Sequence, residues 1–416
     1  MFGTVPLTHR TLDDYRAVLP EERIEELRSL AAPLRGARVL HLSVTAFGTG
    51  VADMLGTSVP LMNDLGVECH WQIVRAGEEF QQVSRALYAA LVGGRYVTWN
   101  SQLTDTWLRY NEMNAALLDE PFDVVVVHDP QPLGIRSFLP DGAGAAGRAR
   151  WVWHSHLDLS GAQEDVWLLL RAQVEGYDAV VFESERFAVR DLPHIPAHTI
   201  PPAIDPLGPR NMELSREAVY SVMSRYGVDA GWPIMAQIAP FDENNDPLGA
   251  LEVYRAVKRR VPEVRLVLFA TIVPEDPVLR TYFDRVVAEA QDDPDIVVLT
   301  DYSCVGNVEI NVFQRSADVV LQRALHKGFG LWVAEAMYKG RPVVAGPGVG
   351  LAEQITNGET GLAAADVEGL ADAVVRLLRE PELAKTVGAA GKRYIEERYL
   401  IPRFVADYVR LLRSFA

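Results

Sequence analysis

Short apolar runs alternate along the first half of the chain with longer stretches that have the spacing of amphipathic helices. The runs are Val39–Ser43, Cys69–Val74, Asp123–Val127 and Ala179–Phe182, and a helical stretch from Val51 to Leu65 follows the first of them. Buried parallel strands are nearly continuous apolar runs, and successive parallel strands need a crossover connection, usually a helix. The pattern therefore predicts a mostly parallel sheet wrapped by helices, a doubly wound α/β domain.

A proline-rich stretch, residues 198–209 (HTIPPAIDPLGP), interrupts this alternation. Proline biases the residue before it away from helix, so the stretch indicates a linker. With 416 residues the chain is also long enough for two hydrophobic cores. We predict an N-terminal domain over residues 1–205 and a second α/β domain over residues 206–393. The strand-like runs of the second domain are Pro233–Ile238, Arg265–Ala270, Ile296–Thr300, Val319–Leu321 and Pro342–Ala345.

The end of the chain, Tyr394–Phe415, keeps helical spacing, but no strand follows it. We therefore expect residues 394–416 to form a C-terminal helix that crosses back to the N-terminal domain. Ligands of doubly wound domains bind outside the carboxyl ends of the strands. Two such domains in tandem predict a binding site in the cleft between them.

Charge and hydropathy narrow the choice of partners. The chain carries 40 basic and 56 acidic side chains, a formal charge of −16 at pH 7. This balance argues against a general nucleic-acid or anionic-membrane surface and favours a small-molecule partner. The N-terminus lacks an apolar signal core, and no run reaches the roughly 18 apolar residues of a membrane helix. We expect a cytoplasmic protein. Its two cysteines, Cys69 and Cys304, have no CxxC spacing, which indicates neither a disulfide framework nor a zinc site.

The turn Gly48-Thr49-Gly50 stands between the first predicted strand and its helix. Backbone N–H groups at the positive end of a helix can bind an anion or a sugar hydroxyl. Glycines also simply permit tight turns, and the spacing alone leaves both interpretations open.

Polar residues follow the strand DVVVV directly, as His128, Asp129 and Gln131 in the motif HDPQP. The carboxyl end of a parallel strand is where such side chains reach a ligand, and the prolines stiffen the loop for hydroxyl binding. We favour this hypothesis over a capped loop with a buried, hydrogen-bonded histidine.

A second polar motif, WHSHLD, ends another short strand and contains His154, His156 and Asp158. A His-x-His pair can bind zinc, but no third ligand stands at a characteristic spacing. We therefore expect no metal, and we expect the three side chains to bind substrate.

In the second domain, Lys327 precedes a glycine turn that leads into a helix carrying Glu335. Anions or hydroxyls could bind at this turn. Alternatively, its apolar residues belong to the core and Glu335 is solvated. A later loop, Gly346–Gly350, includes Val349 and Gly350 and is a second candidate for backbone donors toward a phosphate, although a flexible turn is an equal alternative. The turn residues themselves are Gly328, Phe329, Gly330 and Leu331.

Taken together, seven motifs resemble the glycosyltransferring trehalose synthases over nearly the whole chain. They are HDPQP, WxxHxDLS, PPAIDPL, FDxxxDPLG, FQRSADVVLQ, GFGLxVAEAMxKGxPVV and NGETG. The GFGL motif marks the wider group of retaining two-domain glycosyltransferases. The resemblance implies a GT-B fold in which the N-terminal domain holds a sugar or sugar phosphate and the C-terminal domain holds a nucleotide sugar. It implies no cofactor and no metal, and it leaves a homodimer open.

The resemblance also implies roles for particular residues. Asp129 and His156 match positions at the sugars of the reaction centre, and Gly48–Gly50 match the acceptor and phosphate-facing loop. Glu335 matches the glutamate that holds the nucleotide ribose. A retaining transfer of this kind needs no protein nucleophile, because the leaving diphosphate assists the acceptor. Positioning and charge stabilisation then do the chemistry.

Several donor-side positions depart from the family pattern. The arginine and the lysine that grip the diphosphate are here Pro240 and Asn245, and the glutamate eight positions before Glu335 is Lys327. The arginine of the WxxHxD segment is His154. Each lost charge-assisted contact is worth roughly 1.5–3 kcal/mol, so ordinary nucleotide-sugar binding would weaken.

Two hypotheses follow from these departures. In the first, Lys327 acts at the reaction centre and, with Arg323, restores positive charge for an altered or phosphorylated substrate. The protein is then a retaining transferase with a changed donor or acceptor, and it forms a trehalose-like 1,1-linked sugar or pseudo-sugar. In the second, the chain is a non-catalytic homologue that acts as a binding or regulatory module. We favour the first.

Overall fold

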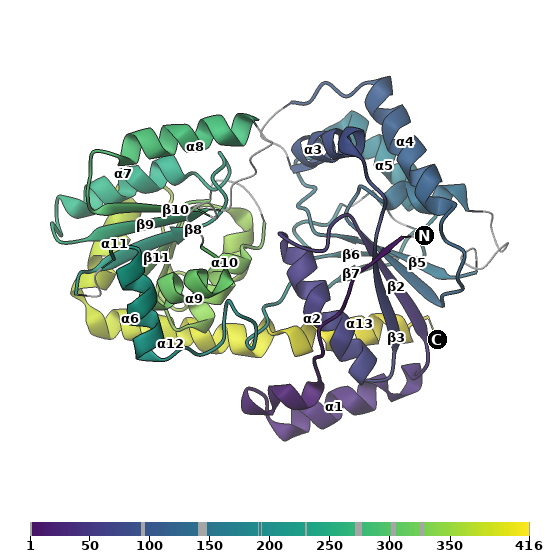
Figure 1. Ribbon diagram of the computed structural model, residues 1–416, viewed down its shortest axis with the longest axis horizontal. Coiled ribbons are helices and arrows are strands. Elements are labelled where there is room, and N and C mark those ends of the chain that lie inside the picture. The colour runs from purple at the N-terminus through teal and green to yellow at the C-terminus, as the bar shows by residue number, and fades with distance from the viewer. Residues whose placement is uncertain are drawn as a thin grey trace. The chain divides into compact units, whose positions relative to one another are not determined.

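The computed structural model describes residues 2–92, 96–139, 148–189, 191–192, 194–228, 231–270, 277–300, 305–324 and 328–415. The chain divides into two compact units, each with its own sheet (Figure 1). Unit 1 comprises Met1–Ala203 together with Ile401–Ala416, and unit 2 comprises Ile204–Leu400. The two units are two α/β domains with largely parallel sheets, as the strand and helix pattern predicted.

Among its described residues, unit 1 has a seven-stranded sheet in the order β1-β3-β2-β4-β5-β6-β7. All neighbouring strands are parallel except β1, which pairs antiparallel with β3. The strands are β1 (Gly3–Thr4), β2 (Arg38–Ser43), β3 (Glu68–Ile73), β4 (Val124–His128), β5 (Arg150–Ser155), β6 (Ala179–Phe182) and β7 (Ala197–Thr199).

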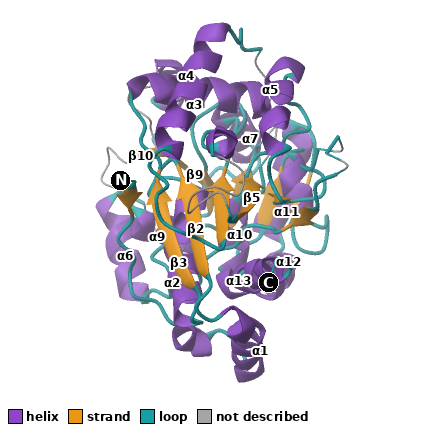
Figure 2. Cartoon of the chain, turned by 90° about the vertical axis from the view of Figure 1, so that its right-hand side faces the viewer, coloured by secondary structure: helices purple, strands orange, loops and turns teal. Residues whose placement is uncertain are grey.

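The helices of unit 1 cover both faces of this sheet. Figures 1 and 2 show α3, α4 and α5 on one face and α1, α2 and α13 on the other. The core includes Trp151 and Trp153 of β5, which are fully buried. The helices are η1 (Leu12–Ala17), α1 (Glu21–Ala31), η2 (Ala32–Leu34), α2 (Gly50–Asp64), α3 (Glu78–Val92), α4 (Ser101–Ala115), η3 (Leu133–Phe138), α5 (Glu164–Val174) and α13 (Ile401–Arg413).

Unit 2 has a six-stranded, fully parallel sheet in the described residues, in the order β10-β9-β8-β11-β12-β13. Side chains from α7, α8 and α11 fill its main core cluster. The strands are β8 (Ile234–Ile238), β9 (Arg265–Ala270), β10 (Ile296–Thr300), β11 (Val319–Gln322), β12 (Val343–Ala345) and β13 (Leu362–Ala363). The helices are α6 (Arg216–Arg225), α7 (Pro247–Lys258), α8 (Pro277–Ala290), α9 (Asn307–Ser316), α10 (Leu331–Tyr338), η5 (Val349–Glu353), α11 (Val367–Arg379) and α12 (Pro381–Arg398).

Every apolar run singled out in the sequence forms a strand, but the single C-terminal helix predicted over residues 394–416 is wrong. Helix α12 ends at Arg398 and α13 begins at Ile401. Pro402 explains the break, because proline is tolerated in the first turn of a helix but cannot continue one that has already begun. Only the second of these helices belongs to unit 1.

In the part of the chain that the structure describes, no helix combines the length and the apolar character needed to cross a bilayer.

Candidate functional site

Four neighbouring strands in unit 1 bring four histidines and a glutamate together near the carboxyl edge of the sheet. Strands β2, β4, β5 and β6 are adjacent and parallel, and their register places His128 of β4 directly beside His154 of β5. His41 lies in β2, and His156 and Glu183 follow β5 and β6. Because neighbouring parallel strands end at one edge of the sheet, residues far apart in the sequence become a single cluster.

Three hydrogen bonds link these side chains in a line. Nδ1 of His41 lies 2.9 Å from Nε2 of His128, and Nδ1 of His128 lies 2.9 Å from Nε2 of His156. Nδ1 of His156 lies 2.9 Å from Oε1 of Glu183. Since the carboxylate can only accept, one proton on Nδ1 of each ring satisfies the whole line. His156 is therefore held in one orientation by its neighbours on both sides.

The members of this line differ in their affinity for protons. Burial lowers the pKa of His41 to about 3, and burial with the neighbouring rings lowers the pKa of His128 well below its usual value. Burial also opposes the charged form of His156, but the hydrogen bond to Glu183 and the charge of Asp129 outweigh it and raise its pKa. Burial raises the pKa of Glu183. Positive charge in the line therefore concentrates on His156.

Asp129 is held against His156 by an unusual backbone conformation. Its φ of 65° lies in the left-handed region, which aspartate tolerates better than most residues. Its Oδ1 accepts a hydrogen bond from the backbone N–H of His156 at 3.0 Å, and Trp153 Nε1 donates to its carbonyl oxygen at 3.0 Å. Strain of this kind persists where surrounding contacts determine the conformation. Asp129 is partly exposed, and the side chain of His156 keeps 6% of its surface exposed.

His154 lies deeper than the sequence indicated. It is fully buried, and its Nδ1 is hydrogen-bonded to the hydroxyl of Tyr408 on α13. Direct contact with a substrate, predicted for His154, does not agree with this burial, because the packing of β5 and α13 covers the ring.

Two other predicted residues of these loops, Asp158 and Gln131, differ in their hydrogen bonding. Asp158 Oδ1 accepts from Ser160 N at 2.8 Å. Gln131 Oε1 is buried and has no hydrogen-bond partner among the described residues.

His128, His154 and His156 form a group that could hold a metal ion, with ligand atoms all within 4.8 Å of one another. From the sequence we expected no metal, because no third ligand stands at a characteristic spacing from the His-x-His pair. The structure supplies that third side chain from β4, through strand pairing. His41, Glu183 and Tyr408 were missed altogether, and the signal that could have found the first two is a polar residue within or directly after an apolar strand.

The glycine turn after β2 is exposed and precedes α2. Gly48 has a φ of 78°, which explains the glycine. The Thr49 hydroxyl accepts from the backbone N–H of Ala52 at 3.2 Å and caps the helix that begins at Gly50. The predicted substrate contacts of this turn stay a prediction.

At the carboxyl edge of the unit 2 sheet, Arg323 follows β11. Its Nε lies 3.5 Å from Oδ2 of Asp246, which caps α7, and neither Nε nor Nη1 has a hydrogen-bond partner among the described residues. Asn245 is fixed by its neighbours, since its amide donates to Asp242 at 2.9 Å and accepts from Gln322 at 3.3 Å. Among the described residues at this edge, Arg323 thus supplies positive charge, whereas Asn245 is neutral. Lys327 lies outside the described residues.

Glu335 is buried on α10 within a polar network of unit 2. Arg210 Nη1 lies 3.8 Å from its Oε1, and Gln314 Nε2 lies 3.5 Å from its Oε2. Lys339, one helical turn further, donates to Gln314 Oε1 at 2.7 Å and to Asn211 Oδ1 at 2.8 Å. The carboxylate therefore has a fixed position.

The turn before α10 is shaped by its glycines. Gly328 and Gly330 have φ values of 84° and 76°, and Gln354 donates to the carbonyl oxygens of Phe329 and Gly330. Phe329 is buried and its ring lies 4.7 Å from that of Tyr399, so it belongs to the core. Leu331, the first residue of α10, is partly exposed.

The second glycine loop packs closely against the chain after β11. The N–H groups of Gly346 and Gly348 donate to the carbonyl oxygens of Gln322 and Ala324, at 2.8 and 3.1 Å. A Cβ at either glycine would come within 3.2 Å of the Ala324 carbonyl oxygen. These two N–H groups are therefore not available to a phosphate. Val349 and Gly350 open η5, and their predicted role as donors stays a prediction.

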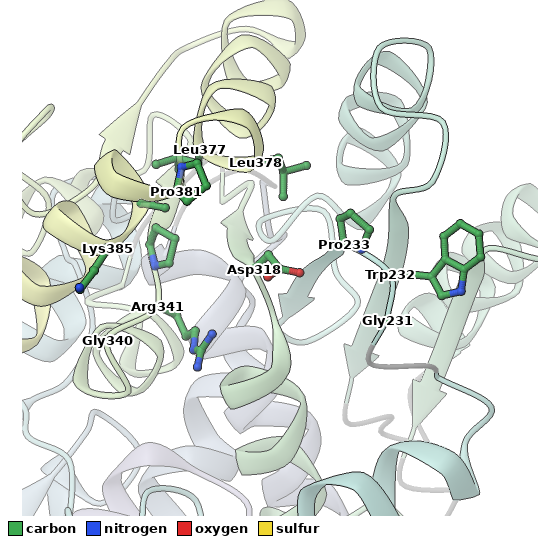
Figure 3. Close-up of a pocket in the computed structure, with 12 residues that line it drawn as sticks. Gly231, Trp232, Pro233, Asp318, Gly340, Arg341, Leu377, Leu378, Pro381 and Lys385 are labelled. Carbon is green, nitrogen blue, oxygen red and sulfur yellow. The ribbon is translucent and has the colours of Figure 1, made fainter. Parts of the chain in front are cut away.

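A cavity of about 570 Å³ lies elsewhere, at the amino ends of the unit 2 strands (Figure 3). Pro233, Asp318 and Pro342, which precede β8, β11 and β12, line it together with residues of α11 and α12. It stands at the opposite edge of the sheet from Arg323, so it belongs to neither candidate site.

Comparisons with known proteins agree with one another. Residues 41–189 match the family described as trehalose synthase, N-terminal domain, and residues 247–380 match glycosyl transferases group 1. A trehalose synthase of Rubrobacter xylanophilus is 40% identical over 407 residues, which cover 97% of this chain and 96% of the relative.

Solved structures show the same fold. A trehalose-6-phosphate protein from E. coli, bound with UDP-2-fluoro glucose, matches with a TM-score of 0.73 at 15% identity, over 91% of this chain and 99% of that one. An α,α-trehalose-phosphate synthase of Burkholderia xenovorans in complex with glucose-6-phosphate matches with a TM-score of 0.71 at 14% identity, over 91% and 100%.

Proposed function

The chain belongs to the trehalose synthase family of glycosyltransferases, and we propose that it transfers a glucose-like unit from a nucleotide sugar to a sugar acceptor, with retention of configuration. The product we propose is a trehalose-like 1,1-linked sugar. The observation that carries this proposal is the fixed line of side chains from His41 to Glu183, which holds His156 beside the partly exposed Asp129.

The proposed chemistry needs no nucleophile from the protein. The bond from the anomeric carbon to the diphosphate oxygen breaks while an acceptor hydroxyl oxygen bonds to the same face of that carbon. The hydroxyl proton passes to the departing diphosphate. Asp129 then acts by positioning sugar hydroxyls. His156, whose two ring nitrogens are both engaged in the line, acts by stabilising charge, and an environment that is already organised makes such groups effective.

The choice of substrates draws support from the two ligand-bound relatives of the same fold. One binds a uridine diphosphate sugar analogue, and the other binds glucose-6-phosphate. We propose a nucleotide glucose as donor, and glucose or a glucose phosphate as acceptor.

On the donor side we propose that Arg323 supplies charge to the diphosphate in place of the arginine and lysine that Pro240 and Asn245 replace. Nε and Nη1 of its guanidinium are buried, Nε lies 3.5 Å from Asp246 Oδ2, and neither nitrogen has a hydrogen-bond partner among the described residues, so the group keeps unused donors for a diphosphate. Glu335 is proposed to act on the ribose side, and Lys327 remains a proposed contact of the donor sugar. No observation favours the non-catalytic alternative.

To test the proposal, the purified protein is incubated with each combination of a donor (UDP-, ADP- or GDP-glucose) and an acceptor (glucose or glucose-6-phosphate). The products are identified by NMR. We expect one donor to give a 1,1-linked disaccharide with both anomeric centres α. His156→Gln should abolish most of the transfer, whereas His70→Gln, a half-buried histidine of β3, should not. Nucleotide binding without transfer in every combination would refute the proposal in favour of a binding module.

A further inference from the structure

In the histidine cluster of unit 1, not every ring nitrogen takes part in a hydrogen bond. Nε2 of His154 is buried and has no hydrogen-bond partner in the part of the chain that the structure describes, although a buried imidazole nitrogen without a partner costs free energy. The ligand nitrogens of His154, His128 and His156 all lie within 4.8 Å of one another. We propose that these three histidines bind one divalent transition-metal cation of the zinc class.

The second nitrogen of each ring is already held by another group. Nε2 of His128 lies 2.9 Å from His41 Nδ1, and Nδ1 of His156 lies 2.9 Å from Glu183 Oε1. Nδ1 of His154 is paired with the hydroxyl of Tyr408. Metal-binding histidines nearly always have their outer nitrogen engaged in this way, because the partner fixes the ring and its tautomer. All three histidines show that arrangement.

Metal binding requires one rearrangement of protons and movements of the rings. In the line of hydrogen bonds, His128 carries its proton on Nδ1. Moving that proton to Nε2, with the matching change in His41, frees the Nδ1 lone pair without any change of net charge. The 2.9 Å between His128 Nδ1 and His156 Nε2 must open to roughly 3.3 Å, the separation that follows from tetrahedral bonds of about 2.0–2.1 Å. The separations from the His154 nitrogen, which lie within 4.8 Å, must reach the same value.

The energetic balance favours the cation once it is present. The metal-free cluster keeps one hydrogen bond between His128 and His156 and leaves His154 Nε2 without a partner. The cation replaces that single hydrogen bond with three metal–nitrogen bonds, and one of them satisfies His154. A neutral set of three imidazoles suits zinc, cobalt, nickel or copper, whereas magnesium and calcium prefer oxygen ligands. The side chain of His156, which keeps 6% of its surface exposed, offers the route of entry.

The proposal does not rest on the proposed transfer reaction, so its test needs no substrate. Tag-free protein is treated with a chelator, exchanged into metal-free buffer, loaded with Zn²⁺ and passed through a gel-filtration column, and bound metal is measured by mass spectrometry. We expect one Zn²⁺ per chain in the wild type. His154→Gln should lose at least ten-fold in Zn²⁺ affinity, and His70→Gln should bind as the wild type does.

A second measurement on the wild type guards against variants that fail to fold, which circular dichroism would reveal. Co²⁺ bound by three imidazoles in a four- or five-coordinate site absorbs strongly in the visible range, and Zn²⁺ should displace it. Three outcomes would each overturn the proposal. They are less than one Zn²⁺ bound per wild-type chain, an unchanged Zn²⁺ affinity in a folded His154→Gln variant, and a Co²⁺ complex that shows only the weak visible absorption of an octahedral site.

Discussion

The hydroxyl of Tyr408 is hydrogen-bonded to Nδ1 of His154, although 254 residues separate them in the sequence. Both side chains are fully buried. The contact connects the last helix of the chain to the centre of the histidine cluster on β5. Helix α13 is therefore part of the site's support as well as of the core, and the two roles can be separated by removing a single oxygen atom.

Tyr408→Phe keeps the aromatic ring and deletes that oxygen. His154 then has no partner on either nitrogen among the described residues, and we expect the free energy of unfolding to fall by about 1–3 kcal/mol in a urea titration. Tyr96→Phe, at a position that is 80% exposed, should change it by less than about 0.5 kcal/mol. Equal stability of Tyr408→Phe and the wild type would show that the contact contributes nothing.

Two substitutions at Asp129 can distinguish the effect of its backbone conformation from the effect of its charge. Asparagine also tolerates the left-handed region, so Asp129→Asn should preserve stability while it removes the carboxylate, and we expect the rate of transfer to fall about 10²–10³-fold. Asp129→Ala should lose the same activity and, in addition, about 1–2 kcal/mol of stability, because alanine disfavours a φ of 65°. The measurements are initial rates by NMR and urea unfolding. A fully active asparagine variant would remove Asp129 from the reaction centre.

Arg323 is the proposed replacement for the missing donor-side charges. Arg323→Gln should raise the KM for the nucleotide sugar about ten-fold or more, the loss expected when a charge-assisted contact worth roughly 1.5–3 kcal/mol is removed. Arg323→Lys should recover part of it, since lysine keeps the charge but not the planar fork. The control is Arg376→Gln on α11, an exposed arginine of the same unit. If the KM for the nucleotide sugar is unchanged in Arg323→Gln, residues other than Arg323 bind the diphosphate.

The sequence was sufficient to predict much of the fold, because buried parallel strands are continuous apolar runs. Strands β6, β9 and β10 have the bounds that their apolar runs predicted. The break between α12 and α13 was not foreseen, since helical spacing continues through Tyr399 and Leu400. Recognising it required reading Pro402 as the start of a new helix.

The candidate site was predictable only in part, for a different reason. Asp129 and His156 stand directly after strands, and local position indicates their exposure at a carboxyl edge. His41, Glu183 and Tyr408 act through contacts that depend on the order β2-β4-β5-β6 and on where α13 packs, which spacing in the sequence does not specify. The glycine-rich loop led to a prediction of ligand binding that the structure does not support. The loop at Gly346–Gly348 suggested phosphate donors, but its N–H groups pair with the protein's own carbonyl oxygens.

The buried amine of Lys339 provides a test of unit 2 that is independent of activity. Burial lowers its pKa to about 7, the neighbouring carboxylate of Glu335 opposes that shift, and the charges of Arg315 and Arg210 reinforce it. The charge of Glu213 also opposes it. The folded chain therefore binds this proton less tightly than the unfolded chain, where the pKa is close to 10.5.

The sign of the pH dependence follows directly. Between about pH 7 and pH 10.5 the unfolded state carries a proton on Lys339 that the folded state lacks, so the free energy of unfolding gains from this group as pH rises, by at most about 1.4 kcal/mol per pH unit. Lys339→Met, which keeps the length of the side chain and removes the charge, should lack that gain. Urea unfolding of both proteins across the range should show curves that diverge with pH, whereas Lys392→Met, at an exposed lysine of α12, should follow the wild type. Parallel curves for wild type and Lys339→Met would mean that the amine stays protonated in the fold, held by Glu335, Asn211 and Gln314 together.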